Sequence, residues 1–239
     1  MKNNRKALLL LLCAVLMVSA SVFGTLAYLT DTEAVTNTFS VGQVGLKLDE
    51  AKVNKAGDPV NAAGEVVKVE NAPRVTENEY HLLPGHTYTK DPTIHVDANS
   101  EDCYLFVKVD NGIKAIETTD STKTIAAQMA DLGWNPIETN SNIYVYAKDA
   151  GTDNKTVVSK NAKIVVFNNF TIDGDKVVNV QEGKTLPAGK IDIANYASAS
   201  NTTAKVIVTA YAVQKDGFEN STPKQIWDTA LASIATTNP

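Results

Sequence analysis

The chain has 239 residues, of which 44% are apolar and 21% are charged, so it has enough apolar material for a packed core and does not belong to the disordered class. Its formal net charge is −5, and about −8 once the basic residues of the first six positions (Lys2, Arg5, Lys6) are left out, which argues against nucleic acid as a partner. Two cysteines exclude a disulfide-stapled scaffold and a zinc site built mainly from cysteine.

The first 27 residues have the three-part layout of a secretory signal peptide. Residues 1–6 are basic, residues 7–18 form an unbroken apolar run, and a smaller, more polar stretch follows. Thr25 and Ala27 supply the small residues that cleavage needs, so we expect the cut between Ala27 and Tyr28. An uncleaved membrane anchor is the alternative, since the run is long enough to cross a bilayer, but the polar second half favours cleavage. We therefore expect a secreted protein of the extracellular matrix or cell surface, with no membrane contact after cleavage.

Strand patterns dominate the rest of the chain. Residues 103–110 alternate, with Cys103, Leu105, Val107 and Val109 on one face, so we expect half of this strand to be buried. The pair Asp173-Gly174 predicts a tight turn that joins two strands directly. The same strand reading applies to four further segments: 142–148, 163–170, 191–196 and 204–213.

Two helices are predicted, both as lids over the ends of a sheet. The first runs through Ile125, Met129 and Leu132, with Ser121 as a possible cap and Gly133 as its end. The second begins at residues 222–225, which have the spacing of a capping box with proline at the first helical position.

These elements predict a mainly β fold, an antiparallel, jelly-roll-like β-sandwich with about two short helices. We divide the chain into a signal peptide (1–27), an amino-terminal strand region (28–50) and the remainder of a single sandwich domain (51–239). Residues 51–79 are expected to form a long loop or a hairpin excursion.

The sequence offers little that points to catalysis, and we expect neither an enzyme nor a bound cofactor. The three histidines, His81, His86 and His95, do not follow a helical metal-ligand spacing, so we expect polar strand and turn residues rather than a metal site. Cys103 lies in the apolar stripe of its own strand, where a thiol is usually a small buried hydrophobe and not a nucleophile.

The sequence is compatible with two weaker binding sites. A surface Ca²⁺ site is one option, although no acidic D-x-D-x-D-G loop is present and solvated turn carboxylates are expected instead; the residues are Asp149, Asp153, Asp173 and Asp175. A sugar-stacking platform is the other, although strand aromatics more often cover a sheet face; its residues are Trp134, Tyr144 and Tyr146.

The region around the expected cleavage site resembles the TasA/camelysin family of secreted biofilm-matrix proteins, whose leaders are cut by a dedicated signal peptidase. The similar segments span most of the mature chain: 24–31 (GTLAYLTD), 37–42 (NTFSVG), 46–48, 83–85, 93–96, 103–110, 210–214, 217–218 and Trp227. The leader pattern is fairly specific, whereas the interior matches are weaker, because sandwich strands resemble one another. The resemblance implies a jelly-roll sandwich that assembles into extracellular fibres, each subunit lending its amino-terminal strand to a neighbour's sheet.

The sequence itself is compatible with strand lending. Apolar residues recur in the segment that cleavage would free, and the candidate donor residues are Tyr28, Leu29, Val35, Phe39 and Val41. The alternative is that residues 39–48 pair inside their own domain. The expected partners are other copies of the chain, the signal peptidase and other matrix components.

Two further functions stay open. One is a monomeric secreted binding module for glycans or a surface ligand, which would use the aromatic residues and acidic loops. The other is a camelysin-like metallopeptidase, which ranks last because the chain has no recognisable zinc motif.

Overall fold

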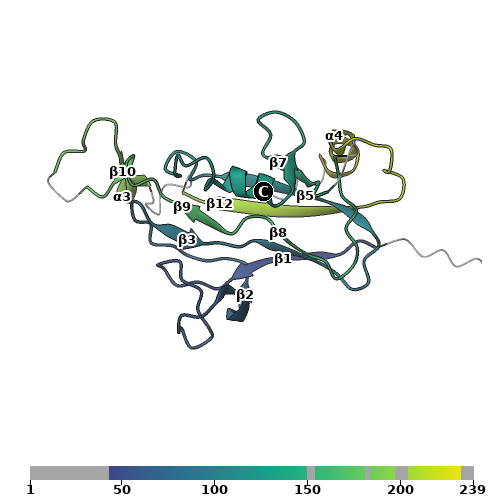
Figure 1. Cartoon of the computed structure of the whole chain (residues 1–239), viewed down its shortest axis with the longest axis horizontal. Helices are drawn as coiled ribbons and strands as arrows, with labels where there is room; N and C mark the ends of the chain where they lie inside the picture. Colours follow the sequence, from purple (N-terminus) through teal and green to yellow (C-terminus); the bar gives the residue numbers. More distant parts are fainter. Residues whose placement is uncertain (1–42, 150–153, 181–183, 197–203, 233–239) are drawn as a thin grey trace, which may run out of the picture. The chain divides into compact units, whose positions relative to one another are not determined.

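The computed structural model describes residues 43–149, 154–180, 184–196 and 204–232 (Figure 1). All of them belong to one compact unit that begins at Gly42. In the described residues strands predominate over helices, and the strands form two antiparallel four-stranded sheets with a shared core. The predicted mainly β, antiparallel sandwich is therefore confirmed.

The first sheet has the strand order β2-β1-β4-β8, with every neighbouring pair antiparallel. Leu46 and Leu48 lie opposite Val96 and Ile94, so the apolar faces of β1 and β4 point the same way. The strands are β1 (Leu46–Ala51), β2 (Arg74–Val75), β4 (Thr93–Val96) and β8 (Lys163–Val165).

The second sheet has the order β12-β5-β7-β6 and is also antiparallel throughout. Its two long strands, β5 and β12, pair along all nine of their residues. The strands are β5 (Cys103–Asn111), β6 (Trp134–Pro136), β7 (Ile143–Tyr146) and β12 (Val206–Gln214).

Short elements complete the unit. One small sheet pairs β3 (Thr87–Thr89) with β9 (Asn169–Thr171), and another pairs β10 (Val177–Val178) with β11 (Ile191–Asp192). The helical pieces are η1 (Val69–Asn71), α2 (Ile125–Asp131), α3 (Ile193–Tyr196), α4 (Pro223–Ile226) and the π-helical turn η3 (Trp227–Leu231).

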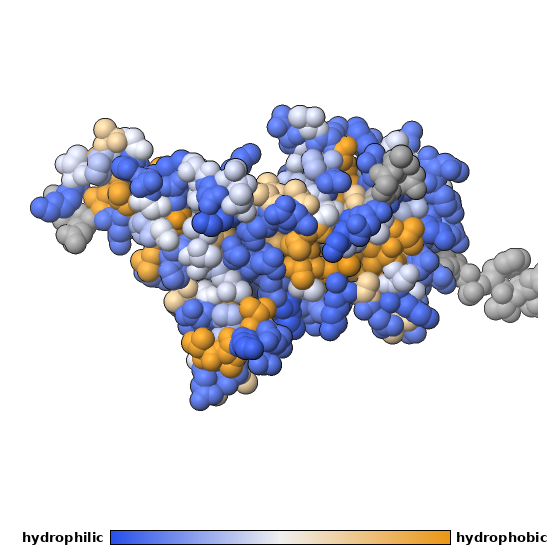
Figure 2. All heavy atoms as spheres, in the orientation of Figure 1, coloured by the Kyte–Doolittle hydropathy of each residue, from blue (hydrophilic) through white to orange (hydrophobic). Residues whose placement is uncertain are grey.

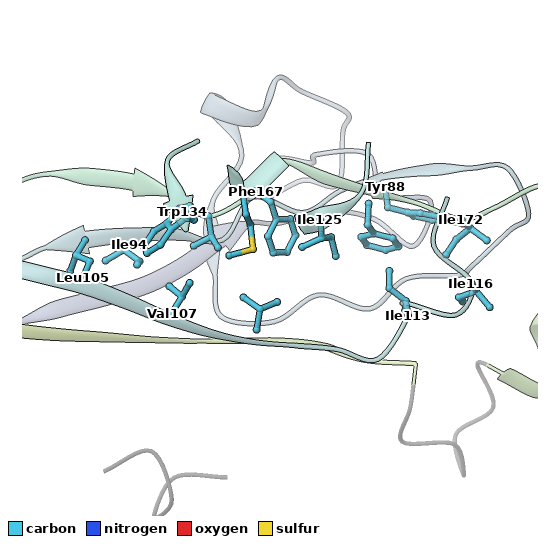
Figure 3. Close-up of a cluster of buried hydrophobic side chains, with 14 of the residues drawn as sticks. Tyr88, Ile94, Leu105, Val107, Ile113, Ile116, Ile125, Trp134, Phe167 and Ile172 are labelled. Atoms are coloured by element: carbon cyan, nitrogen blue, oxygen red, sulfur yellow. The ribbon is translucent and has the colours of Figure 1, made fainter. Parts of the chain in front are cut away.

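The core fills the space between the two sheets (Figure 3). Ile94 enters it from β4, Leu105 and Val107 enter it from β5, and all three are fully buried. Helix α2 adds Ile125 and Met129 to the same cluster. This helix is thus a component of the core and not the peripheral lid that the sequence predicted.

A second apolar cluster covers the outer face of the β12-β5-β7-β6 sheet. Phe106 and Tyr211 lie against Trp227, with ring centroids 6.0 and 5.2 Å apart. Helix α4 begins as predicted, with a capping box between Thr222 and Gln225, and it leads directly into η3. Because these carboxyl-terminal turns cover the outer face, β5 is buried on both faces, and the expectation of a half-buried strand is wrong.

Three local predictions also differ from the structure. Strands β9 and β10 do not pair with each other, because the Asp173 side chain instead accepts hydrogen bonds from the N–H groups of Asp175 and Lys176 and closes a local turn. Residues 193–196 form a helical turn and not a strand. The cap of α2 is Thr124, whose side chain accepts the Ala127 N–H, and not Ser121.

The excursion after β1 contains a short repeat of the form Val-Asn-x-Ala-Gly-Asp/Glu-x-Val. Asn54 and Asn61 occupy the same place in the two copies, and each Oδ1 accepts two backbone N–H groups of its own turn. Each amide nitrogen also donates to the acidic residue of its copy, Asp58 or Glu65. The predicted hairpin excursion therefore consists of two similar turns in succession.

Candidate functional site

The candidate site is the open side of the sandwich, where an edge of each sheet has no neighbouring strand among the described residues. In the second sheet this edge is β12. Gly112 N–H donates to Lys205 C=O, and Lys215 N–H donates to Asp102 C=O, which sets the phase of the β12–β5 ladder. Odd-numbered residues of β12 therefore bond to β5, and even-numbered residues direct their N–H and C=O groups away from it. Among the described residues, β5 is the only strand that pairs with β12.

The corresponding edge of the first sheet is the amino-terminal half of β1. Asp97 N–H donates to Gly45 C=O, so odd-numbered residues of β1 bond to β4. Strand β2 pairs with Glu50 and Ala51 alone, and no described strand covers β1 beside Leu46 and Leu48. The two edges are close neighbours along part of their length.

Apolar side chains from both edges point into the space between them. The four inner-facing residues Val206, Val208, Ala210 and Ala212 pack against the core but stay half-buried, as do Leu46 and Leu48. Figure 2 shows apolar residues gathered between β12 and β1 on the face in view. A deeper β5 residue such as Val107 is fully buried, so the incomplete burial is specific to the open side.

One stretch of this side is hollowed into a groove of about 530 Å³. Its apolar lining comes from both sheets and from the segments between them: Leu48, Leu82, Ile113, Phe170, Val206 and Val208. A groove of this kind, apolar inside and bordered by unpaired backbone groups, is suited to an extended peptide.

A buried ion-pair network lies at the β1 end of the groove. Arg74 Nε donates to Asp49 Oδ1 at 2.7 Å, and its Nη1 donates to Asp91 Oδ2. His95 Nε2 lies 2.9 Å from the same Asp49 oxygen. Burial alone would raise the pKa of Asp49, but the hydrogen bonds from Arg74, Lys47 and His95 outweigh it and hold this pKa below its usual value. The network fixes β2 against β1 and leaves only the other half of β1 open.

A second polar group lies beside the first one. Lys90 Nζ donates to Glu50 Oε2 at 2.6 Å, and Asn78 Nδ2 donates to Glu50 Oε1 at 2.8 Å. Asn78 Nδ2 also donates to Ala51 C=O, and Asn78 Oδ1 accepts the Val53 N–H at 2.9 Å. The Glu50 side chain is 5% exposed and that of Lys90 is 13% exposed, so the pair is largely removed from water.

The sequence did not single out these polar residues. The only indication was that the alternation of β1 breaks after Leu48, where two acids follow in succession at Asp49 and Glu50. Apart from Lys47, their basic and amide partners come from segments 25 to 46 residues away in sequence. No pattern in one sequence specifies that these segments meet.

Most of the sites considered from the sequence are engaged in the fold. His86 Nε2 contacts Ala56 C=O, and His95 belongs to the network described above. In the part of the chain that the structure describes, no group of three or more His, Cys, Asp or Glu could hold a metal ion. Cys103 is fully buried, and burial, aided by the nearby Asp102, raises the pKa of its thiol to about 11.

The aromatic platform is also occupied internally. Trp134 is fully buried and donates its Nε1–H to Val165 C=O, and its ring lies 5.2 Å from that of Tyr146. A buried indole cannot stack on a sugar, so the three residues do not form an exposed binding face. Of the acidic loop residues, Asp153 lies outside the described residues, and Asp173 closes its own turn.

The expected cleavage site, Ala27 and Tyr28, and all five candidate donor residues lie outside the described residues: Tyr28, Leu29, Val35, Phe39 and Val41. Within the described ranges, no helix is both long and apolar enough to cross a membrane.

Comparison with known proteins gives no assignment: no family model, no curated protein and no solved structure matches this chain.

Proposed function

We propose that the chain is a secreted structural subunit of extracellular, biofilm-matrix fibres. In this proposal residues 28–41 of one subunit are the donor strand, and the open side between β12 and β1 of the next subunit is the acceptor. The observation that carries it is β12, a nine-residue strand with one edge that no described strand pairs with and an inner face that the described part of the domain buries incompletely.

The composition of β12 supports this role. Exposed sheet edges are normally protected from other chains by charges, proline, bulges or short length. The segment VIVTAYAVQ has none of these features, since it contains no charged residue and no proline over nine positions. An added strand would pair with the free backbone groups of even-numbered residues, and its alternate side chains would complete the core beside Val208 and Ala210.

The sequence of the amino-terminal segment matches what this acceptor needs. Phe39 and Val41 share one strand face, so both would point toward the half-buried core residues of a neighbour. Donation from each subunit to the next is head-to-tail and does not close on itself, so it produces a filament. Before cleavage the leader tethers this segment, which would make the signal peptidase the switch for assembly.

The first test uses protein that begins at Tyr28. We expect it to form filaments visible by negative-stain electron microscopy, whereas the same protein without residues 28–35 stays monomeric by size-exclusion chromatography with an unchanged circular dichroism spectrum. Filaments from the shortened protein would exclude donation by this segment. Persistent monomers of the longer form at high concentration would favour the monomeric binding module.

The second test addresses the acceptor edge with one substitution. Ala210→Pro removes an N–H that points away from β5, so the sandwich keeps its ladder while the free edge loses a donor and gains a bulky ring. We expect a folded monomer that does not elongate filaments. The matched control is Lys215→Ala, an exchange just beyond β12 that leaves its edge groups unchanged, and this control should polymerise normally.

A further inference from the structure

The polar group formed by Glu50, Lys90 and Asn78 has the composition of a self-acylating site. A primary amine and a carboxamide are hydrogen-bonded to the two oxygens of one carboxylate, at 2.6 and 2.8 Å. The carboxylate side chain is 5% exposed. An amine, an acyl group and a shared acid–base between them are the parts that amide exchange requires.

We propose that Lys90 and Asn78 become joined by an intramolecular isopeptide bond, with Glu50 carrying the proton. This inference concerns a covalent modification inside one subunit, and it stands whether or not the chain forms fibres.

The reaction balances without any co-reactant. Glu50 first takes a proton from the Lys90 ammonium, and the neutral Nζ attacks the Asn78 side-chain carbonyl carbon. Glu50 passes that proton to Nδ2 as the bond between the carbon and Nδ2 breaks, and it then takes the second proton from the acylated Nζ and gives it to the departing ammonia. One Nζ–C bond forms, one C–N bond breaks, ammonium leaves, Glu50 is regenerated as a carboxylate, and nothing is oxidised or reduced.

The surroundings of Asn78 favour this direction. Its Oδ1 accepts the Val53 N–H at 2.9 Å, so a backbone donor is already aimed at the oxygen on which negative charge develops during attack. Its Nδ2 lies against Glu50, the group that protonates it on departure. The Val53 N–H thereby polarises the acyl carbonyl group, and Glu50 supplies a proton to the leaving nitrogen.

Burial favours the reaction over an ordinary ion pair. The Lys90 side chain is 13% exposed, so little water competes for its amine. All three residues line the 530 Å³ groove, which gives the released ammonia a path to solvent.

The bond would fasten the segment that contains Asn78 to the entry of β4, where Lys90 lies just before Thr93. Asn78 already holds this segment against β1 through Ala51 and Val53. A covalent link would make that attachment permanent beside the groove.

The test is mass spectrometry of the full chain, purified and digested with trypsin. Trypsin cleaves after Arg74, Lys90 and Lys108, so unmodified protein yields residues 75–90. An acylated Lys90 is not a trypsin site, so we expect residues 75–108 as one peptide that is lighter by one ammonia, about 17 Da. Cleavage of that peptide after Glu79 should leave its two parts connected.

Two variants distinguish formation of this bond from other reactions that release ammonia. Cyclisation of Asn78 onto its own backbone gives the same change in mass but needs neither Lys90 nor Glu50. Lys90→Arg keeps the charge but provides no acylatable primary amine, and Glu50→Gln removes the proton carrier, so we expect neither variant to show the loss of about 17 Da.

The outcome for the unaltered chain decides the question, whether or not the variants fold well. A linear peptide of residues 75–90 with unchanged mass as the main product overturns the proposal. A lighter peptide that persists in Lys90→Arg overturns it as well.

Discussion

Strands β5 and β12 lie side by side in one sheet, pair along nine residues and differ in what surrounds them. β5 has a strand on each side and an apolar cluster on each face, and six of its residues have no more than 5% exposure. β12 shares its outer cluster, but no strand of the described ranges pairs with its second edge, and its inner side chains stay half-buried. Both strands are largely apolar in sequence, but β5 contains Lys108 and Asp110 whereas β12 contains no charged residue, so a candidate docking strand differs from a structural strand in its edge position and in its lack of charge.

The largest expected loss of stability comes from truncating a side chain of β5. Phe106→Ala removes a fully buried ring that packs against Trp227, and we expect unfolding to become easier by about 4 kcal/mol. Val208→Ala on β12 removes a half-buried side chain that faces the open side, and about 1 kcal/mol is expected. Urea denaturation measures the free energy of unfolding of the two variants, and equal decreases would contradict the contrast between the strands.

A pair of proline substitutions tests the two edges of β12 separately. Thr209→Pro removes an N–H that bonds to β5, so we expect a loss of about 3 kcal/mol. Ala210→Pro removes an N–H on the free edge, and the expected loss is below about 1 kcal/mol. In thermal unfolding at equal concentration, Thr209→Pro should have a clearly lower melting temperature than Ala210→Pro. The reverse order would mean that the odd-numbered residues of β12 do not bond to β5.

The other open strand, β1, provides a pH-dependent test. The pKa of Asp49 is lowered in the folded state, so its contribution to stability is complete at neutral pH and is lost as the pH falls through the unfolded and then the folded pKa. We expect Asp49→Asn to be less stable than the unaltered chain at pH 7 and the difference to shrink toward pH 3. Stability curves from urea titration at several pH values measure this, and a constant difference would argue against the ion-pair network as its cause.

The smallest loss of stability is expected at the start of α4, the helix that with η3 covers the outer face of the second sheet. Thr222→Ala removes the side-chain acceptor of the Gln225 N–H at the start of α4, which is worth about 1 kcal/mol. Near-ultraviolet circular dichroism of Trp227 reports on the packing of this cover. No change in stability would show that the cover does not depend on its cap.

The sequence predicted those parts of the fold that local patterns determine. The alternation of β5 and β12, the capping box at Thr222 and the helix end at Gly133, whose φ is +92°, are all present as expected. The prediction failed where a segment distant in sequence determines burial, as on the outer face of β5, which the carboxyl-terminal turns cover. The candidate site was missed for the same reason, because an unpaired edge is a property of the assembled sheets and of no single segment.

The polar residues beside the groove illustrate the same limit. Glu50, Asn78 and Lys90 lie in three separate segments, and each looks like an ordinary surface residue in its own context. Only the pairing of β1 with β2 and β4 brings them within hydrogen-bonding distance of one another.

The two successive asparagine turns after β1 have a practical consequence. Each turn satisfies its own backbone groups through its asparagine, so each is close to a self-contained module. Val66, in the second turn, is 65% exposed, which places that module on the periphery. A peptide epitope or a fluorophore-labelling tag inserted between Ala62 and Ala63 should therefore report on the protein in living cultures while leaving the sandwich and its candidate docking strand untouched.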